Sequence, residues 1–327
     1  MGKILDIKEL KVVLKKDIYG KEVEILRGVE FAIEEKESVA LVGESGSGKT
    51  LTARAIMGLL PENMYIRSGS IILCGNDIVG MSEEELRSIR GSKAGMIFQE
   101  PSSYLNPVFT AGSQIFEAIK DRGLSTEEKK TRCMNALRNV GLSEDIYYRY
   151  PHQLSGGQQQ RVMIAMSLIN NPSLLLADEP TTSLDVTTAY GIIELLKVLK
   201  ERYGLSLLFI THDISLAVDF VDRIAVMYAG MIVEISGAEN IIKSPLHPYT
   251  EMLISCLPER YNRGERIKTI EGNVPDFYNL PSGCAFHPRC PYAMDICRKS
   301  EPSVIKKDGV FVRCFRYGDN VETGQGK

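Results

Sequence analysis

Short apolar runs and helical patterns alternate along the middle of the chain. Ser38 to Val42 has the pattern of a buried strand, and Leu51 to Leu60 follows with apolar residues at helical spacing. The same alternation returns between Leu174 and about Ile235. Because strands that alternate with helices pair in parallel beneath those helices, the pattern predicts an α/β fold with a mostly parallel sheet.

A polar and mostly helical stretch interrupts this alternation from about residue 101 to residue 170. The pattern predicts helices over Ala111–Lys120 and Thr126–Val140, and a third helix after Ser155. From Gly237 onward the periodicity fades and prolines become frequent, which predicts a small, loop-rich appendage. We therefore expect a core of residues 1–100 and 171–236, a helical subdomain of residues 101–170, and a C-terminal extension of residues 237–327.

The loop after the first of these strands has the composition of a phosphate-binding loop. It reads Gly43, Glu44, Ser45, Gly46, Ser47, Gly48, Lys49 and Thr50, and Leu51 then begins the helix. Glycines let successive backbone N–H groups curl around phosphates, and the N-terminus of the helix favours negative charge. Lys49 would neutralise the γ-phosphate, and the Thr50 hydroxyl would bind Mg²⁺. The run predicts a P-loop nucleoside triphosphatase.

A pair of acids ends a second apolar strand, 135 residues after Gly43. Leu174 to Ala177 precedes Asp178 and Glu179. Asp178 would hold Mg²⁺ through water, whereas Glu179 would polarise the water that attacks the γ-phosphate. In isolation such a pair is often a solvated loop. Its place after the phosphate-binding loop favours catalysis.

A second candidate anion-binding helix begins 111 residues after Gly43, at Leu154, Ser155, Gly156, Gly157 and Gln158. This run resembles the LSGGQ signature of the ATP-binding cassette family. The resemblance implies that the signature of one chain covers the γ-phosphate held by the phosphate-binding loop of a second cassette. ATP hydrolysis would then require a head-to-tail pair.

Other positions resemble the same family and take their expected roles from it. Gln99 stands where the family has a glutamine that senses Mg²⁺ and the membrane partner. The run Ser183, Leu184 and Asp185 resembles the D-loop, and His212 resembles the switch histidine that contacts the γ-phosphate. Tyr19, 24 residues before Gly43, is the candidate for stacking on adenine. Surface or core filling is the alternative for Tyr19, and a structural role is the alternative for His212.

The C-terminal extension narrows the resemblance to one branch of the family. The run from Pro245 to Thr250 contains His-Pro-Tyr-Thr, and Met227 to Gly230 reads Met-Tyr-Ala-Gly. Both resemble the ATPases of dipeptide, oligopeptide and nickel importers, in particular the D-type subunit of peptide systems. The resemblance implies a sister cassette or a second copy, two transmembrane permease subunits and an extracytoplasmic peptide-binding protein. Nickel import is the alternative within this branch.

Four of the seven cysteines fall within 31 residues, at Cys284, Cys290, Cys297 and Cys314. Disulfides are improbable in a reducing cytosol, so the cluster suggests a metal site. Paired C-x₂-C motifs of zinc ribbons are absent, and the region resembles one that holds a 4Fe-4S cluster in this importer branch. Zinc and free buried thiols remain alternatives. A separate, metal-stabilised appendage predicts that Cys290→Ser spares nucleotide affinity.

Composition limits the remaining function classes. The 327 residues carry a net charge of −3 with a pI near 6.0, which gives poor grounds for a nucleic-acid surface. We find no secretory signal and no apolar run near the roughly 20 residues that span a bilayer. The expected location is therefore the cytoplasm, peripheral on the inner face of the membrane. A cassette ATPase of repair or translation is the alternative outside transport.

Overall fold

A mostly parallel sheet forms the centre of the molecule, with antiparallel strands at one edge. The structure is a computed structural model that describes all residues except 1, 16–19, 258–260, 262–268, 308–309 and 319–327. In chain order the strands of the sheet are β3 (Ser38–Val42), β6 (Ala94–Ile97), β7 (Leu174–Asp178), β8 (Ser206–Thr211), β9 (Arg223–Tyr228), β10 (Met231–Gly237), β11 (Ile305–Lys307) and β12 (Val310–Val312). Their spatial order is β11-β12-β10-β9-β3-β8-β7-β6. The strands from β9 to β6 run parallel, as the sequence predicted.

One face of this sheet packs on a second, antiparallel sheet that the sequence analysis did not predict. Its strands are β1 (Lys3–Leu14), β2 (Val23–Glu34), β4 (Met64–Leu73) and β5 (Asn76–Asp77), in the order β2-β1-β4-β5. Helix α1 (Lys49–Ile56) packs into the same core, and α2 (Glu83–Ile89) follows this sheet in the chain. Alternate residues of β3 point to opposite faces, so Val39 and Leu41 enter this core, whereas Ala40 and Val42 enter the other.

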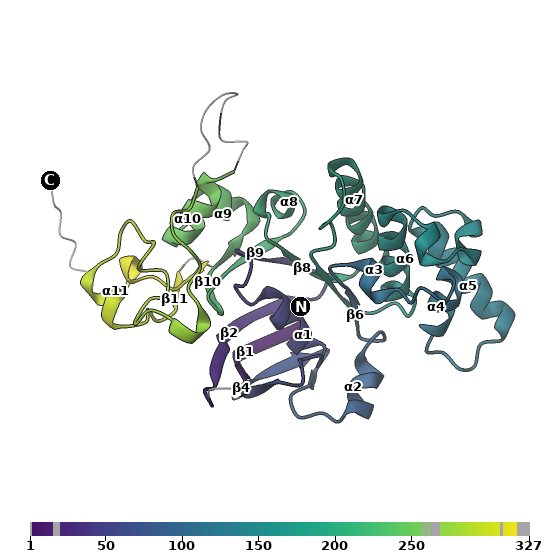
Figure 1. The fold of residues 1–327 in the computed structure, drawn as a ribbon, viewed down its shortest axis with the longest axis horizontal. Helices are drawn as coiled ribbons and strands as arrows, with labels where there is room; N and C mark the ends of the chain where they lie inside the picture. The colour runs from purple at the N-terminus through teal and green to yellow at the C-terminus, as the bar shows by residue number, and fades with distance from the viewer. Residues whose placement is uncertain (1, 16–19, 258–260, 262–268, 308–309, 319–327) are drawn as a thin grey trace.

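Helices pack on the opposite face of the central sheet and continue beyond β6 to one end of the molecule (Figure 1). They are α3 (Pro101–Tyr104), α4 (Ala111–Glu117), α5 (Thr126–Asn139), α6 (Gly156–Leu168), α7 (Val186–Tyr203), α8 (Ile214–Val218), α9 (Ala238–Lys243) and α10 (Pro248–Ser255). The 3-10 turns η1 (Glu144–Tyr148) and η2 (Pro151–Gln153) precede α6. The predicted helices of the insert correspond to α4, α5 and α6.

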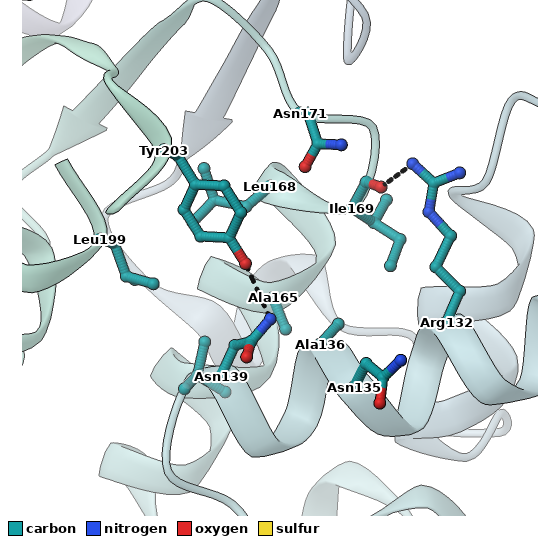
Figure 2. Close-up of a pocket in the computed structure, with 11 residues that line it drawn as sticks. Arg132, Asn135, Ala136, Asn139, Ala165, Leu168, Ile169, Asn171, Leu199 and Tyr203 are labelled. Atoms are coloured by element: carbon teal, nitrogen blue, oxygen red, sulfur yellow. Dashed lines mark hydrogen bonds between the residues drawn. The ribbon is translucent and has the colours of Figure 1, made fainter. Parts of the chain in front are cut away.

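Helices α5, α6 and α7 surround a cavity of about 190 Å³ (Figure 2). At one end of it the Asn139 amide donates a hydrogen bond of 2.7 Å to the Tyr203 hydroxyl. At the other end the Arg132 guanidinium donates to the carbonyl of Ile169. These bonds join the end of α5 to α7 and the middle of α5 to the end of α6, so the helical insert is anchored to the helix that follows the acid pair.

The C-terminal region is part of the same fold. Strand β12 pairs with β10, and β11 pairs with β12, so both extend the central sheet. Tyr249, Ile254 and Phe286 are buried in the core on the helical face of the sheet. Figure 1 shows this region, with α11 (Asp295–Lys299), at the opposite end of the molecule from α4 and α5. The division at residue 237 stays a prediction, but the region shares sheet and core with the rest.

Candidate functional site

The loop between β3 and α1 requires glycine at several positions. Gly46 and Gly48 have φ angles of 80° and 109°, in the left-handed region that favours glycine. A Cβ atom on Gly43 would come 2.2 Å from the carbonyl oxygen of Met227, at the end of β9. The glycine pattern is therefore explained by backbone conformation and by close packing against the neighbouring strand.

The Lys49 ammonium lies inside this loop. Its Nζ donates hydrogen bonds of 2.8 Å to the carbonyl of Gly43 and 3.0 Å to the carbonyl of Glu44. Burial lowers the pKa of Lys49, and the nearby carboxylates of Glu179, Asp178 and Glu44 oppose this shift. A buried cation aimed at the loop backbone is suited to an anionic ligand.

Asp178 and Thr50 meet at the ends of neighbouring elements. The Thr50 hydroxyl donates a hydrogen bond of 3.1 Å to Oδ1 of Asp178. The pKa of Asp178 is raised to about 6, mainly by burial; the Thr50 hydrogen bond opposes this rise, and the Glu179 charge contributes to it. Hydroxyl and carboxylate oxygens of this kind are the ligands that Mg²⁺ prefers.

Three side chains hold the carboxylate of Glu179. The Gln99 amide and the Thr182 hydroxyl donate to Oε2 at 3.0 Å and 2.9 Å, and Nδ1 of His212 lies 3.3 Å from Oε1. Glu179 has a φ angle of 44°, an unfavourable conformation for a residue with a side chain. The sequence analysis did not identify Thr182, although it lies only three residues after Glu179.

Lys49, Thr50, Gln99, Glu179 and His212 line one open pocket of about 690 Å³, and Asp178 is joined to it through its hydrogen bond with Thr50. They come together because β3, β6, β7 and β8 are parallel neighbours whose carboxyl ends meet at one edge of the sheet. The pocket residues are Ile25, Glu44, Ser45, Gly46, Gly48, Lys49, Thr50, Leu51, Arg54, Pro61, Met64, Gln99, Glu179 and His212. Sequence analysis missed Ile25, Arg54, Pro61 and Met64, which carry no motif. Tyr19 lies outside the described residues.

The five residues from Leu154 to Gln158 do not line this pocket, although all of them are described. Ser155 caps α6, because its hydroxyl accepts from the Gln158 N–H at 3.3 Å and the Gln158 side chain accepts from the Ser155 N–H at 3.0 Å. A Cβ atom on Gly157 would lie 2.6 Å from Cγ2 of Thr188. The signature run therefore packs against α7 and does not line the nucleotide pocket of its own chain.

The run from Ser183 to Asp185 leads into α7 and lies beside the signature run. Asp185 caps α7 by accepting a hydrogen bond of 3.0 Å from the Thr188 N–H. A Cβ atom on Gly156 would lie 3.4 Å from Cδ2 of Leu184. Ser183 has a φ angle of 69°. The candidate D-loop and the signature run thus form one surface through contacts with the start of α7.

The histidine of the His-Pro-Tyr-Thr run has a structural role. His247 is buried at the N-terminus of α10, and its Nδ1 accepts a hydrogen bond of 3.1 Å from the Tyr249 N–H. Burial lowers the pKa of His247 to about 3, so the ring stays neutral and can accept this bond. The buried Glu234 carboxylate accepts the N–H groups of Leu246 and His247 at 2.9 Å and 2.8 Å. These contacts of the His-Pro-Tyr-Thr run hold the backbone of Tyr249 in place.

The four clustered cysteines line one small cavity, together with His247 and Phe286. Burial raises the pKa of Cys284 to about 11 and also raises the pKa values of Cys290 and Cys314. Among the described residues, no group of three or more His, Cys, Asp or Glu side chains is placed to hold a metal ion. The expected metal-binding appendage is therefore not shown. Cys74, Cys133 and Cys256 do not line this cavity.

Most of the chain is similar in sequence to known proteins. Residues 26–182 match the family model "ABC transporter", and residues 233–297 match "Oligopeptide/dipeptide transporter, C-terminal region". The oligopeptide transport ATP-binding protein AppD of Bacillus subtilis is 44% identical over 97% of this chain and 98% of its own. The dipeptide transport ATP-binding protein DppD of Escherichia coli is 43% identical over 88% of this chain and 89% of its own.

The fold is likewise similar to solved structures. A dimeric, post-hydrolysis structure of the ATP-binding cassette MJ0796 bound to ADP and Pi is 34% identical. It covers 72% of this chain and 98% of its own, with a TM-score of 0.65. In the part of this chain that the structure describes, every helix is too short or too polar to cross a membrane.

Proposed function

The chain belongs to the ABC transporter family, and from this premise we propose that it is the ATP-hydrolysing subunit that powers import of dipeptides and oligopeptides through a membrane permease. Members of this family bind ATP with Mg²⁺. The observation that carries the peptide assignment is the C-terminal region with its His-Pro-Tyr-Thr run, which matches the oligopeptide/dipeptide model and packs in the core below β10. In this function the chain works as a peripheral subunit on the cytoplasmic face of the membrane.

Reconstitution tests this assignment. We expect the chain, combined in liposomes with two permease subunits and a second cassette, to hydrolyse ATP faster when the binding protein carries a peptide. Peptide uptake should depend on ATP. Stimulation by nickel-loaded binding protein in place of peptide would support the nickel alternative. Co-purification with nucleic acid or ribosomes and without permease would contradict a transport function.

The pocket geometry supports specific roles in ATP binding. Lys49 would neutralise the β- and γ-phosphates, and the loop amides from Gly43 to Thr50 would surround them, because the lysine lies inside the loop and most of the loop lines the pocket. Thr50, Asp178 and Gln99 are the proposed Mg²⁺ ligands, directly or through water. The apolar side of the pocket at Ile25, Pro61 and Met64 is suited to the base. Tyr19 stays a sequence-based proposal for stacking on adenine.

The proposed hydrolytic group is Glu179. Its carboxylate is held by three side chains, so it can accept a proton from water in a fixed orientation. His212, whose side chain is 58% exposed, can reach from Glu179 toward a γ-phosphate. Gln99 would report the presence of nucleotide because it bonds to Glu179 and begins the segment leading to α3.

A partner cassette would complete the site. The signature run from Leu154 to Gln158 does not line the pocket of its own chain, which supports a role in the pocket of a second cassette. Val186 and Tyr190, at the start of α7 beside the candidate D-loop, are 88% and 64% exposed. These apolar side chains on the same surface are suited to burial between two cassettes, either two copies or a sister pair.

A separate exposed apolar surface is suited to the membrane permease. It comprises Tyr104, Val108, Phe109, Tyr148 and Tyr150, all more than a third exposed. The Ala111 N–H donates to the Arg149 carbonyl at 2.8 Å, which joins the two segments that carry these residues. The segment from Gln99 to Pro107 leads into this surface from the catalytic pocket. We assign the surface to the coupling helices of the permease.

Charge on this surface should disrupt assembly. Val108→Asp, at a side chain 70% exposed, is expected to weaken co-purification with the permease by about tenfold or more, because a carboxylate would be buried at the interface. ATP binding by the isolated chain should not change. Val198→Asp is a matched control, since Val198 is 57% exposed on α7 outside the surface. Equal recovery of permease with both variants would contradict the assignment.

We propose that the four cysteines hold a 4Fe-4S cluster, as the resemblance of this region implies, with zinc as the alternative. A tetrahedral zinc ion with Zn–S bonds of about 2.3 Å needs its sulfur atoms within about 4 Å of one another. The described residues contain no group placed to hold a metal ion, but Cys284, Cys290, Cys297 and Cys314 all line one small cavity, and four thiolates are a ligand set of 4Fe-4S clusters. When bound, the cluster would supply folding free energy to the region.

Removing a ligand should remove the cluster. Cys314→Ser is expected to lose most of the iron and sulfide that the wild type retains on anaerobic purification, because one of four sulfur ligands is missing. Cys256→Ser is the control, since Cys256 lies outside the cavity. Iron and sulfide analysis with the visible absorption spectrum measures the outcome. Stoichiometric zinc in the wild type, or thiols without metal, would contradict the cluster.

A further inference from the structure

The C-terminal region contacts the phosphate-binding loop at one residue, Glu44. Its backbone N–H donates a hydrogen bond of 2.9 Å to the hydroxyl of Tyr249. Its carboxylate receives two bonds from Arg289, from Nη1 to Oε2 at 2.7 Å and from Nη2 to Oε1 at 3.0 Å. This is a bidentate pair between residues 245 positions apart.

Arg289 is itself held in place. Its side chain is only 5% exposed, and its Nε donates a hydrogen bond of 3.0 Å to the carbonyl of Glu271. Its guanidinium lies 5.9 Å from the centroid of the Tyr228 ring. Because the Arg289 side chain is buried and its donors have defined partners, its pair with Glu44 differs from exposed ion pairs, which contribute little to stability.

Tyr249 is equally constrained. It is fully buried, and its ring lies 4.6 Å from Tyr228 and 5.3 Å from Phe286 between ring centroids. The buried His247 ring accepts its backbone N–H. The phenol oxygen therefore has little freedom to follow a movement of the loop, and it fixes the position of the Glu44 backbone.

Glu44 transmits this position to the phosphate-binding groups. Its carbonyl accepts hydrogen bonds from Lys49 Nζ at 3.0 Å and from the Ser47 N–H at 3.2 Å. Tyr249 and Arg289 thus hold the backbone and the side chain of the residue whose carbonyl orients the lysine. The loop conformation depends on groups from the last third of the chain.

We propose that Arg289 and Tyr249 are positioning residues of the ATP site, which hold Glu44 so that the loop is ordered before phosphate binds. This inference rests on the proposed ATP-binding function of the loop. Pre-ordering lowers the entropy lost when ATP binds, so losing it should appear as weaker ATP affinity. A contact that only attached the C-terminal region to the core would change stability without changing affinity.

The test compares two ion pairs between the same regions. Arg289→Met keeps the apolar stem and removes both bonds to Glu44. Glu301→Gln is the control, because it removes the charge from the Arg27–Glu301 pair of 2.7 Å, which joins β2 to the C-terminal region, and neither residue lines the nucleotide pocket. MgATP affinity is measured by titration, and stability by thermal unfolding without nucleotide. Glu179→Gln serves as the background, so that hydrolysis does not interfere.

We expect Arg289→Met to weaken MgATP binding by about 10- to 100-fold, as for a lost charged hydrogen-bonding partner. Glu301→Gln should stay within about twofold. Arg289→Lys should recover part of the affinity, since charge returns without the bidentate geometry. Tyr249→Phe should also weaken binding, because it leaves the Glu44 N–H without its acceptor. Equal affinity of Arg289→Met and Glu301→Gln would overturn the inference.

A double-mutant cycle covers the case in which Arg289→Met fails to fold. Glu44→Gln alters the pair from the loop side, and Arg289→Lys in that background should have little further effect if the two act together. Independent, additive effects on affinity would overturn the inference. If the wild type itself bound no MgATP, the proposed function would fail. If the wild type binds MgATP and the affinity of Arg289→Met is unchanged, only this inference fails.

Discussion

Glu179→Gln is expected to bind MgATP about as tightly as the wild type and to hydrolyse it about 10²- to 10⁴-fold more slowly. The change removes the carboxylate that accepts a proton from water but keeps the length of the side chain. Lys49, Thr50 and Asp178, the proposed binding groups, are untouched. We therefore expect ATP to accumulate between two closed cassettes.

Single-turnover hydrolysis, ATP titration and the mass of the ATP-bound species measure these effects. Glu201→Gln, an exposed acid on α7, controls for the loss of a negative charge. The result that contradicts the assignment is turnover near the wild-type rate, which would place the base elsewhere. Loss of ATP binding would instead give Glu179 a structural role, since its carboxylate joins Gln99, Thr182 and His212.

Gly156→Asp is expected to abolish ATP hydrolysis while leaving the ATP affinity of the isolated chain unchanged. A carboxylate at the start of α6 would face the γ-phosphate of a partner, and juxtaposed like charges cost several kcal/mol, which corresponds to a loss of about 100-fold or more. The fold should tolerate the change. A Cβ atom here lies at an ordinary contact distance of 3.4 Å from Leu184, and Asp is favourable in the first turn of a helix.

Mixing experiments separate action within one chain from action between chains. Gly156→Asp protein retains its phosphate-binding loop, whereas Lys49→Ala protein retains its signature. If two copies pair head to tail, the mixture contains one complete site and should regain activity that neither variant has alone. An inactive mixture, from a wild type active by itself, would mean that the signature serves its own chain. Gly156→Ala, which adds no charge, should retain most activity.

Much of the nucleotide site could be predicted from sequence because its groups are contiguous and follow strand ends. The strand before Gly43, the strand before Asp178 and the strand before His212 were each visible as short apolar runs. Parallel neighbours bring their carboxyl ends to one edge, so local motifs were enough to place Lys49, Gln99 and Glu179 together. The antiparallel sheet of β1, β2, β4 and β5 was missed, since its strands carry no motif.

The C-terminal region shows where sequence reasoning stopped. Fading periodicity suggested an appendage separate from the nucleotide site, with Cys290→Ser sparing ATP affinity. That expectation no longer follows, because Arg289, the neighbour of Cys290, binds Glu44. The sequence identified the tyrosine of the His-Pro-Tyr-Thr run only as a family mark. Its hydroxyl acts on a residue 205 positions away, and no local pattern predicts such a distance.

The sequence by itself determined which chemistry the chain carries: a phosphate-binding loop, an acid pair, a signature and a set of four thiols. Each depends on residue type and short spacing, which a linear pattern records. Only the tertiary structure decided which of these groups meet. It placed the signature outside its own pocket, gathered the cysteines around one cavity, and set Tyr249 and Arg289 against Glu44. These contacts arise from the packing of distant segments into a shared core, where burial leaves a polar group few partners.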